Sequence, residues 1–220
     1  MHGILIFLVL LVFTKIKNKI IEGVPYLNQT GYPTGCESIS TVMCLHYRNI
    51  NISPKEFIDN YLDKGIFYYK NGQMFAPHPS DKFVGSPYDS HSFGCYEPVI
   101  ERALNKLILD RNLKYEVVNL TNVDMEIIKT DYIDKNIPVI FWATVSMKDY
   151  IIKNVWIVPE TGEKFLWRGN EHCLLLIGYD EENYYFNDPM AEKRKKYPKE
   201  KVEKCHKDLY SMAIALVKKE

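Results

Sequence analysis

Apolar residues recur at helical spacing in the first half of the chain. In residues 37–49 the apolar positions lie three or four residues apart, which predicts a helix. Ser53 and Glu56 form a capping box around Pro54 and predict the start of a second helix there. Two further helices are predicted by the same spacing, over residues 97–109 and from Thr121 to Tyr132.

The second half contains short runs of β-branched and aromatic residues bounded by turn residues, which predict strands. These runs cover residues 138–145, 150–157, 172–178, 183–187 and 209–217, and an earlier strand is predicted over 113–119. Because the helices come early and the strands late, the sequence predicts an α+β fold with an antiparallel sheet rather than a doubly wound parallel one. Residues 65–95 lack a period and are expected to be irregular, and the Lys-rich segment 191–208 is expected to be a solvated surface helix or loop.

The amino terminus carries ten unbroken apolar residues, from Ile4 to Phe13. A membrane-spanning helix needs about 18 such residues, whereas the apolar centre of a secretory signal has about 7–15. We therefore expect residues 1–20 to be a signal peptide or a membrane tether acting through residues 4–13, and residues 21–220 to form one domain. The location expected from this is secreted or anchored at the cell surface; a buried first strand of a cytoplasmic protein is the alternative.

Composition and charge narrow the classes of function. Lys plus Arg number 28 and so do Asp plus Glu, so the chain lacks the basic surplus of a nucleic-acid binder, and no nucleic-acid partner is expected. Its five cysteines include no C-x-x-C pair, and adjacent Cys–His pairs are poor metal-ligand geometry, so neither a metal nor another cofactor is expected. A monomer is expected.

Cys36 stands where a loop becomes an apolar helix. A thiol at a helix N-terminus lies near unpaired backbone N–H groups and the positive end of the helix dipole, and both favour the reactive thiolate. Gly35 before it allows a substrate backbone to approach closely. A small buried cysteine at a helix start is the alternative interpretation.

His172 and Asp188 bound a predicted hairpin. His172 precedes one apolar strand, Asp188 follows the next, and the turn 178–183 between them brings both to the open end. The carboxylate can then accept a hydrogen bond from one imidazole nitrogen and leave the other facing a thiol. A structural histidine and an ordinary Asp-Pro turn are the alternatives.

Gln29, seven positions before Cys36, is a candidate oxyanion donor together with the Cys36 backbone N–H. Alone it carries no information. Taken together in this chain order, Gln29, Cys36, His172 and Asp188 indicate a catalytic site far more strongly than Gln29 does by itself.

Three segments resemble the bacterial papain-like cysteine peptidases related to bacteriocin-processing peptidases, that is, the soluble "like" branch of cysteine peptidase family thirty-nine. The segments are VPYLNQ from Val24 with YPTGCES from Tyr32, FVGSP from Phe83, and HCLLLIGYD from His172 with its following NDP. The resemblance covers roughly residues 22–218. It implies a papain-like fold in which a helical lobe carries Cys36, a sheet lobe carries His172, and the substrate cleft lies between them.

By position, the resemblance implies Cys36 as nucleophile, His172 as general base and acid, Asp188 as the residue orienting the imidazole, and Gln29 as oxyanion donor. Bacteriocin-processing members usually have Asp before the nucleophile and Gly after it, whereas this chain has Gly35 and Glu37. The expected function is a thiol hydrolase acting on a peptide or protein substrate. A non-catalytic surface binding module and an amidase or transglutaminase-like acyltransferase are the alternatives, and a metal enzyme is the weakest.

Overall fold

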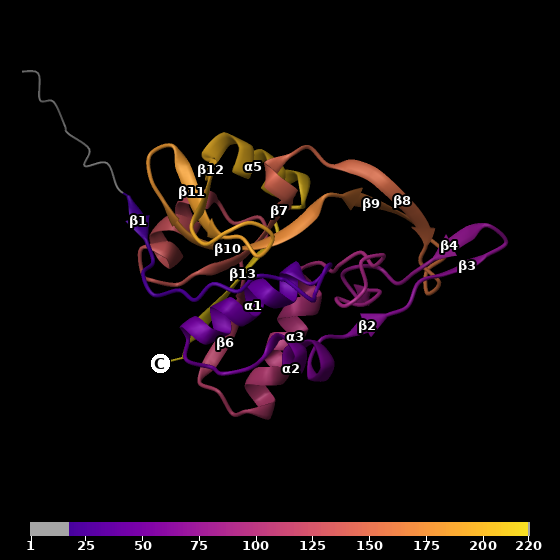
Figure 1. Ribbon diagram of the computed structural model, residues 1–220, viewed down its shortest axis with the longest axis horizontal. Coiled ribbons are helices and arrows are strands. Elements are labelled where there is room, and N and C mark those ends of the chain that lie inside the picture. Colours follow the sequence, from indigo (N-terminus) through magenta and orange to yellow (C-terminus); the bar gives the residue numbers. More distant parts are fainter. Residues whose placement is uncertain (1–17, 220) are drawn as a thin grey trace, which may run out of the picture.

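The computed structural model describes residues 18–219 and has helices packed against an antiparallel sheet (Figure 1). The helices are α1 (Cys36–Tyr47), α2 (Pro54–Asn60), α3 (Glu97–Asp110), α4 (Met125–Ile127) and α5 (Lys199–Asp208), with a π-helical turn η1 (Ile128–Ile133) and a 3₁₀ turn η2 (Val145–Met147). The α+β class expected from the sequence is therefore confirmed.

The main sheet runs in the order β12-β11-β10-β7-β13-β6, and β1 pairs with β10 beside this path. Its strands are β1 (Lys19–Ile20), β6 (Tyr115–Asn119), β7 (Val139–Thr144), β10 (Glu171–Tyr179), β11 (Asn183–Asn187), β12 (Lys195–Pro198) and β13 (Ala213–Lys218), and all the pairings are antiparallel. Strand β7 is buried along its whole length because α1 and α5 both pack on it. The predicted β10–β11 hairpin is present.

Two smaller sheets lie beside the helical part. Strands β3 (Tyr68–Lys70), β4 (Gln73–Phe75), β8 (Ile151–Ile157) and β9 (Lys164–Gly169) form a four-stranded sheet that extends away from the main body (Figure 1). Strands β2 (Lys64–Gly65) and β5 (Phe83–Val84) form a parallel pair. The expectation that residues 65–95 are irregular is therefore wrong in part. Strands β2, β3, β4 and β5 are only two or three residues long, which is too short to show a period in the sequence.

Helix α1 occupies the centre of the molecule. Every residue from Cys36 to Leu45 is buried, because α2 and α3 cover one side of the helix and β10 and β7 the other (Figure 1). Helix α2 begins as predicted, with the Ser53 side chain accepting from the Glu56 N–H. The helix predicted from Thr121 begins later instead, because the Asp124 carboxylate caps it by accepting from the Glu126 N–H.

The Lys-rich segment 191–208 contains the expected surface helix and, in addition, a strand that was not expected. It supplies strand β12 and helix α5, which turns Val202, Cys205 and His206 inward while its Lys and Glu side chains face outward. Its charge pattern concealed an amphipathic helix with a narrow apolar stripe.

Strand β1 shows where the described fold begins. Lys19 and Ile20 pair with Tyr179 and Gly178 of β10, two residues before the domain boundary expected at residue 21. Gly178 permits this pairing, since a Cβ there would lie 2.4 Å from the Lys19 carbonyl oxygen. The apolar run of residues 4–13 lies outside the described residues, and within residues 18–219 no helix is long and apolar enough to cross a membrane.

Candidate active site

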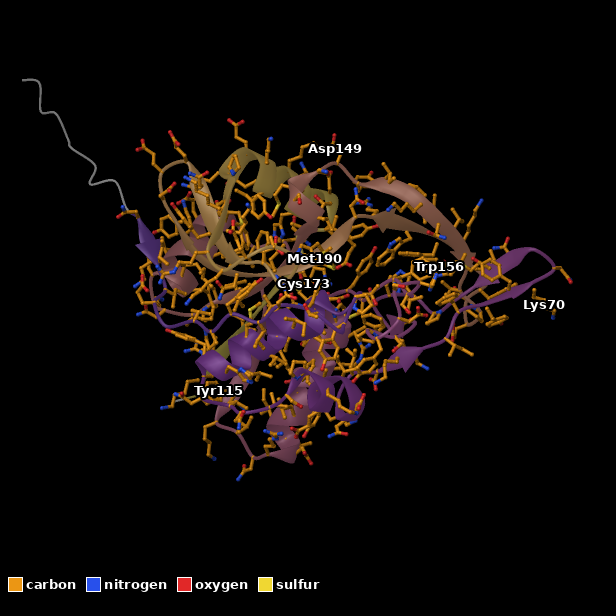
Figure 2. All side chains as sticks on the ribbon, viewed as in Figure 1. Lys70, Tyr115, Asp149, Trp156, Cys173 and Met190 are labelled. Atoms are coloured by element: carbon orange, nitrogen blue, oxygen red, sulfur yellow. The ribbon has the colours of Figure 1, made fainter. Side chains whose placement is uncertain are left out.

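Cys36 is the first residue of α1, and Gly35 caps the helix. A Cβ on Gly35 would lie 2.9 Å from the Tyr32 side chain, so the turn before the helix requires glycine. One turn into the helix, the Ser40 hydroxyl donates to the Cys173 carbonyl at 3.0 Å and ties α1 to β10. This contact brings the start of the helix to the start of the strand, and Figure 2 shows Cys173 directly above α1.

The thiol of Cys36 is buried and surrounded by acidic groups. The residue is 6% exposed, and its Sγ donates to Oε2 of Glu37 at 3.4 Å. Burial raises the pKa of the Cys36 thiol well above its usual value, and the charges of Glu37 and Glu171 raise it further. The expectation of a thiolate favoured by the helix N-terminus is therefore wrong for this state, because desolvation and two carboxylates outweigh the helix.

The buried position also differs from the expectation that Cys36 lies in a substrate cleft between the two lobes. The segment at Gly94 closes over the site: a Cβ on Gly94 would lie 2.7 Å from Oε1 of Glu37 and 2.9 Å from Oε2 of Glu171. The Cys95 N–H donates to the same Glu37 oxygen at 2.6 Å and holds the segment there.

His172 and Asp188 form the hydrogen bond expected from the hairpin. Nε2 of His172 donates to Oδ1 of Asp188 at 2.8 Å, and both side chains are almost fully buried. Asp188 also accepts from the Tyr197 hydroxyl at 2.7 Å and from the Met190 N–H at 2.9 Å. Burial by itself raises the pKa of Asp188, but the hydrogen bond and charge of His172, with the two other donors, outweigh it and hold this pKa below its usual value.

An ionised Asp188 places the imidazole proton on Nε2. The other ring nitrogen, Nδ1, is buried and has no hydrogen-bond partner within residues 18–219. A neutral imidazole in this tautomer carries its lone pair on Nδ1, which is the atom a base would use.

The thiol lies against the backbone of Cys173, the residue that follows His172, and not against the imidazole. The Cys173 backbone N–H hydrogen-bonds the Cys36 sulfur, so the thiol lies against the peptide that joins Cys173 to His172. Consecutive strand residues point to opposite faces, however, and His172 turns toward Asp188. In the part of the chain that the structure describes, the hydrogen bond of the thiol goes to Glu37 and none joins it to His172.

Gln29 lies in the loop before α1 and is 8% exposed. Its side-chain N–H groups donate to the carbonyls of Pro33 at 3.1 Å and Tyr32 at 3.4 Å, so the amide stabilises its own loop in this state. The donors expected to face an oxyanion are thus occupied.

Glu37 and Glu171 are the neighbours of the thiol that sequence reasoning missed. Burial raises the pKa of Glu37 to about 7, although the hydrogen bond from the Cys95 N–H lowers it. Burial together with the charge of Glu37 raises the pKa of Glu171. One follows Cys36 and the other precedes His172, so adjacency to two candidate residues was the available signal. The Cys36 sulfur and one oxygen of each carboxylate lie within 4.8 Å of one another, a set that could hold a cation.

Comparisons with known proteins agree with this arrangement. The sequence model of the Peptidase_C39 like family matches residues 21–214. The chain is 25% identical over 184 residues to the uncharacterized protein YvpB of Bacillus subtilis (strain 168), covering 84% of this chain and 69% of that protein. A crystal structure described as that of a candidate C39-like peptidase from Bacillus anthracis has the same fold, with a TM-score of 0.78 and 24% identity over 93% of this chain and 99% of the other.

The family match spans nearly the whole described region and includes the helix start at Cys36, the strand start at His172 and the turn at Asp188. This chain belongs to the Peptidase_C39 like family.

Proposed function

We propose that the protein is a cysteine-type peptidase or amide hydrolase in which Cys36 is the nucleophile, His172 the general base and acid, and Asp188 the residue that orients the imidazole. The observation that carries the proposal is the buried His172–Asp188 hydrogen bond, which leaves Nδ1 without a partner among residues 18–219. Cys36, at a helix N-terminus, lies against the backbone of Cys173, the residue that follows His172. Family membership supports a cysteine peptidase.

The reaction begins with transfer of the thiol proton to Nδ1 of His172. The thiolate then attacks a peptide carbonyl, the C–N bond breaks, and His172 gives the proton to the leaving amine. Water, deprotonated by His172, hydrolyses the thioester and restores the thiol. Asp188 stabilises the imidazolium in both halves of the cycle and stays ionised because its pKa is low.

Two changes from the described state are part of this proposal. The Cys36 thiol turns from Glu37 toward His172, and the Gln29 amide turns from the Tyr32 and Pro33 carbonyls toward the oxyanion. The Cys36 backbone N–H, at the first position of α1, is the second oxyanion donor. The substrate is a peptide or protein that opens the segment at Gly94 as it binds.

Burial of the thiol favours a second candidate, a non-catalytic papain-like binding module. In such a protein Cys36 is a core residue and its hydrogen bond to Glu37 is permanent. The two candidates differ in the reactivity of one sulfur atom.

Alkylation of the folded chain by iodoacetamide at neutral pH tests the proposal. We expect Cys36, once it turns toward His172, to react faster than free cysteine, and Cys36→Ala to abolish this fast labelling. All five cysteines are buried in the described state, so only activation by His172 should set Cys36 apart. Peptide mapping by mass spectrometry identifies the labelled residue. A Cys36 that reacts no faster than free cysteine would favour the binding module.

A further inference from the structure

A cavity of about 500 Å³ opens beside the candidate active site. It lies between the segments around Phe67 and Phe93 and the β8–β9 hairpin, and Glu171 at the start of β10 lines it. Trp156 of β8, whose ring contacts Phe93 and Trp167 of the cavity lining, lies to the right of Cys173 in Figure 2. Because Glu171 precedes His172, one strand position separates the cavity from the candidate base.

Aromatic rings line one part of this cavity, and polar side chains line the rest. Phe67 meets Phe93 edge to face with centroids 5.3 Å apart, and Phe93 meets Trp167 in the same way at 5.9 Å. Tyr69, which is 65% exposed, lines the mouth. Faces of aromatic rings attract organic cations, and most strongly where water is excluded.

Glu171 supplies a carboxyl group whose ionised form a bound cation would stabilise. Its Oε1 is buried and receives no hydrogen bond from residues 18–219, whereas a buried carboxylate oxygen is normally paired. Its Oε2 faces Gly94 and the Glu37 carboxylate, and no ion pair involves either carboxylate among residues 18–219. Two groups at the rim, Lys153 and His91, are exposed, and neither forms an ion pair with Glu171 among the described residues.

We propose that this cavity is a substrate subsite for an organic cation, namely the side chain of a lysine or arginine next to the scissile bond, with Glu171 as the pairing carboxylate and the rings of Phe93, Trp167 and Tyr69 as its walls. The proposal rests on the proposed function and names its substrate class. A cation seated on Glu171 lies within one side-chain length of the Cys36 sulfur, since both belong to the cluster within 4.8 Å.

A divalent metal is the competing occupant, because Cys36, Glu37 and Glu171 together offer a thiol and two carboxylates. The cavity favours the organic cation, since of the three donor residues only Glu171 lines it and the rings of Phe93 and Trp167 offer a metal no ligand.

Charged thiol reagents test the proposal on the full chain. Methanethiosulfonates that carry a trimethylammonium-ethyl, a methyl or a sulfonatoethyl group deliver a cation, a neutral group or an anion to the same sulfur. At low ionic strength we expect the ratio of cationic to anionic rate constants at Cys36 to exceed the ratio for free cysteine about tenfold. Glu171→Gln should reduce this excess to within about twofold, and Tyr69→Leu should reduce it two- to fivefold.

The matched control is Glu181→Gln, which removes an exposed carboxylate in the β10–β11 turn and should leave the ratio unchanged. Equal ratios in the wild type and Glu171→Gln would overturn the subsite. Protection of Cys36 from the neutral reagent by Zn²⁺, with no dependence of the ratio on Glu171, would overturn it in favour of a metal site. The neutral reagent by itself reports the proposed function, so the two can fail separately.

Equilibrium binding tests the subsite without a reactive thiol. In Cys36→Ala, calorimetry should show N-acetyl-lysine amide binding at least tenfold more tightly than its uncharged counterpart N-acetyl-norleucine amide. Glu171→Gln in the same background should remove the difference. Equal affinities for the two amides would contradict the proposal.

Discussion

The first three residues of β10 divide two polar regions that differ in how completely their hydrogen bonds are formed. On one face, Asp188 accepts from His172, Tyr197 and Met190, and its pKa is low. On the other, Glu37 and Glu171 crowd a protonated thiol, and their pKa values are high. A buried carboxylate stays charged when enough hydrogen-bond donors and positive charge face its oxygens, and its pKa rises when they do not. The Asp188 side is thus a fixed base-orienting unit, and the Glu37 side is the one that can respond to a ligand.

The largest loss of stability is expected when Asp188, the carboxylate with three hydrogen-bond donors, is removed. Asp188→Ala leaves His172 Nε2 and the Tyr197 hydroxyl buried without an acceptor, which should cost about 3–5 kcal/mol in the free energy of unfolding. Urea unfolding at pH 7 measures this loss. A loss below about 1 kcal/mol would mean that the Asp188 pair does not organise the strand ends.

The free energy of unfolding that depends on Glu37 should fall as the pH rises, whereas the contribution of Asp188 is lost as the pH falls. The pKa of Glu37 is about 7 when folded and about 4.3 in an unfolded chain, so the folded state binds the proton more tightly. Its contribution is fully present below about pH 4.3 and is lost as the pH rises through 7, by roughly 4 kcal/mol at most. Urea unfolding at pH 5 and pH 7.5 should show this loss in the wild type and a smaller one in Glu37→Gln. Identical losses in both would contradict the assignment.

Gly94→Ala tests the contact that closes the acidic side. The new Cβ would lie within 3 Å of an oxygen of Glu37 and of Glu171, which should cost about 1–3 kcal/mol and expose the thiol. Unfolding and iodoacetamide labelling measure the two consequences. Gly72→Ala is the control for adding a Cβ where no atom lies within 4 Å, although both positions have positive φ.

The smallest effect is expected at Tyr197. Removing its hydroxyl in Tyr197→Phe deletes one of the three donors to Asp188 and should cost about 1 kcal/mol while raising the pKa of Asp188. The wild type loses the Asp188 contribution as the pH falls through the depressed folded pKa, and the variant should lose it at a higher pH. Acid unfolding monitored by circular dichroism checks the shift, and an unchanged midpoint would exclude this role for the hydroxyl.

Local patterns predicted one of these two sides and not the other. The turn 178–183 and the flanking apolar runs suffice to place His172 beside Asp188, because a hairpin fixes its own register. Tyr197, on the next strand, was hidden in a segment dominated by Lys and Glu. Strand β9 was also missed, since its apolar run is only three residues long, between Lys164 and Arg168.

The acidic cluster depends on contacts distant in sequence. Glu37 and Glu171 meet only because α1 docks on β10 through Ser40, and Gly94 comes from a third segment. No period or spacing encodes this meeting, and it reverses the expected ionisation of Cys36. The helix N-terminus was identified correctly, but its electrostatics were set by desolvation and by neighbours that the sequence does not place.

The most direct test of the account is the pH–rate profile for iodoacetamide alkylation of Cys36 in the wild type and in His172→Ala. The account predicts a reactive fraction near neutral pH in the wild type, because Nδ1 accepts the thiol proton, and a profile in His172→Ala that rises only at alkaline pH. Superimposable profiles would show that the imidazole and the thiol do not act together and would contradict the proposed mechanism.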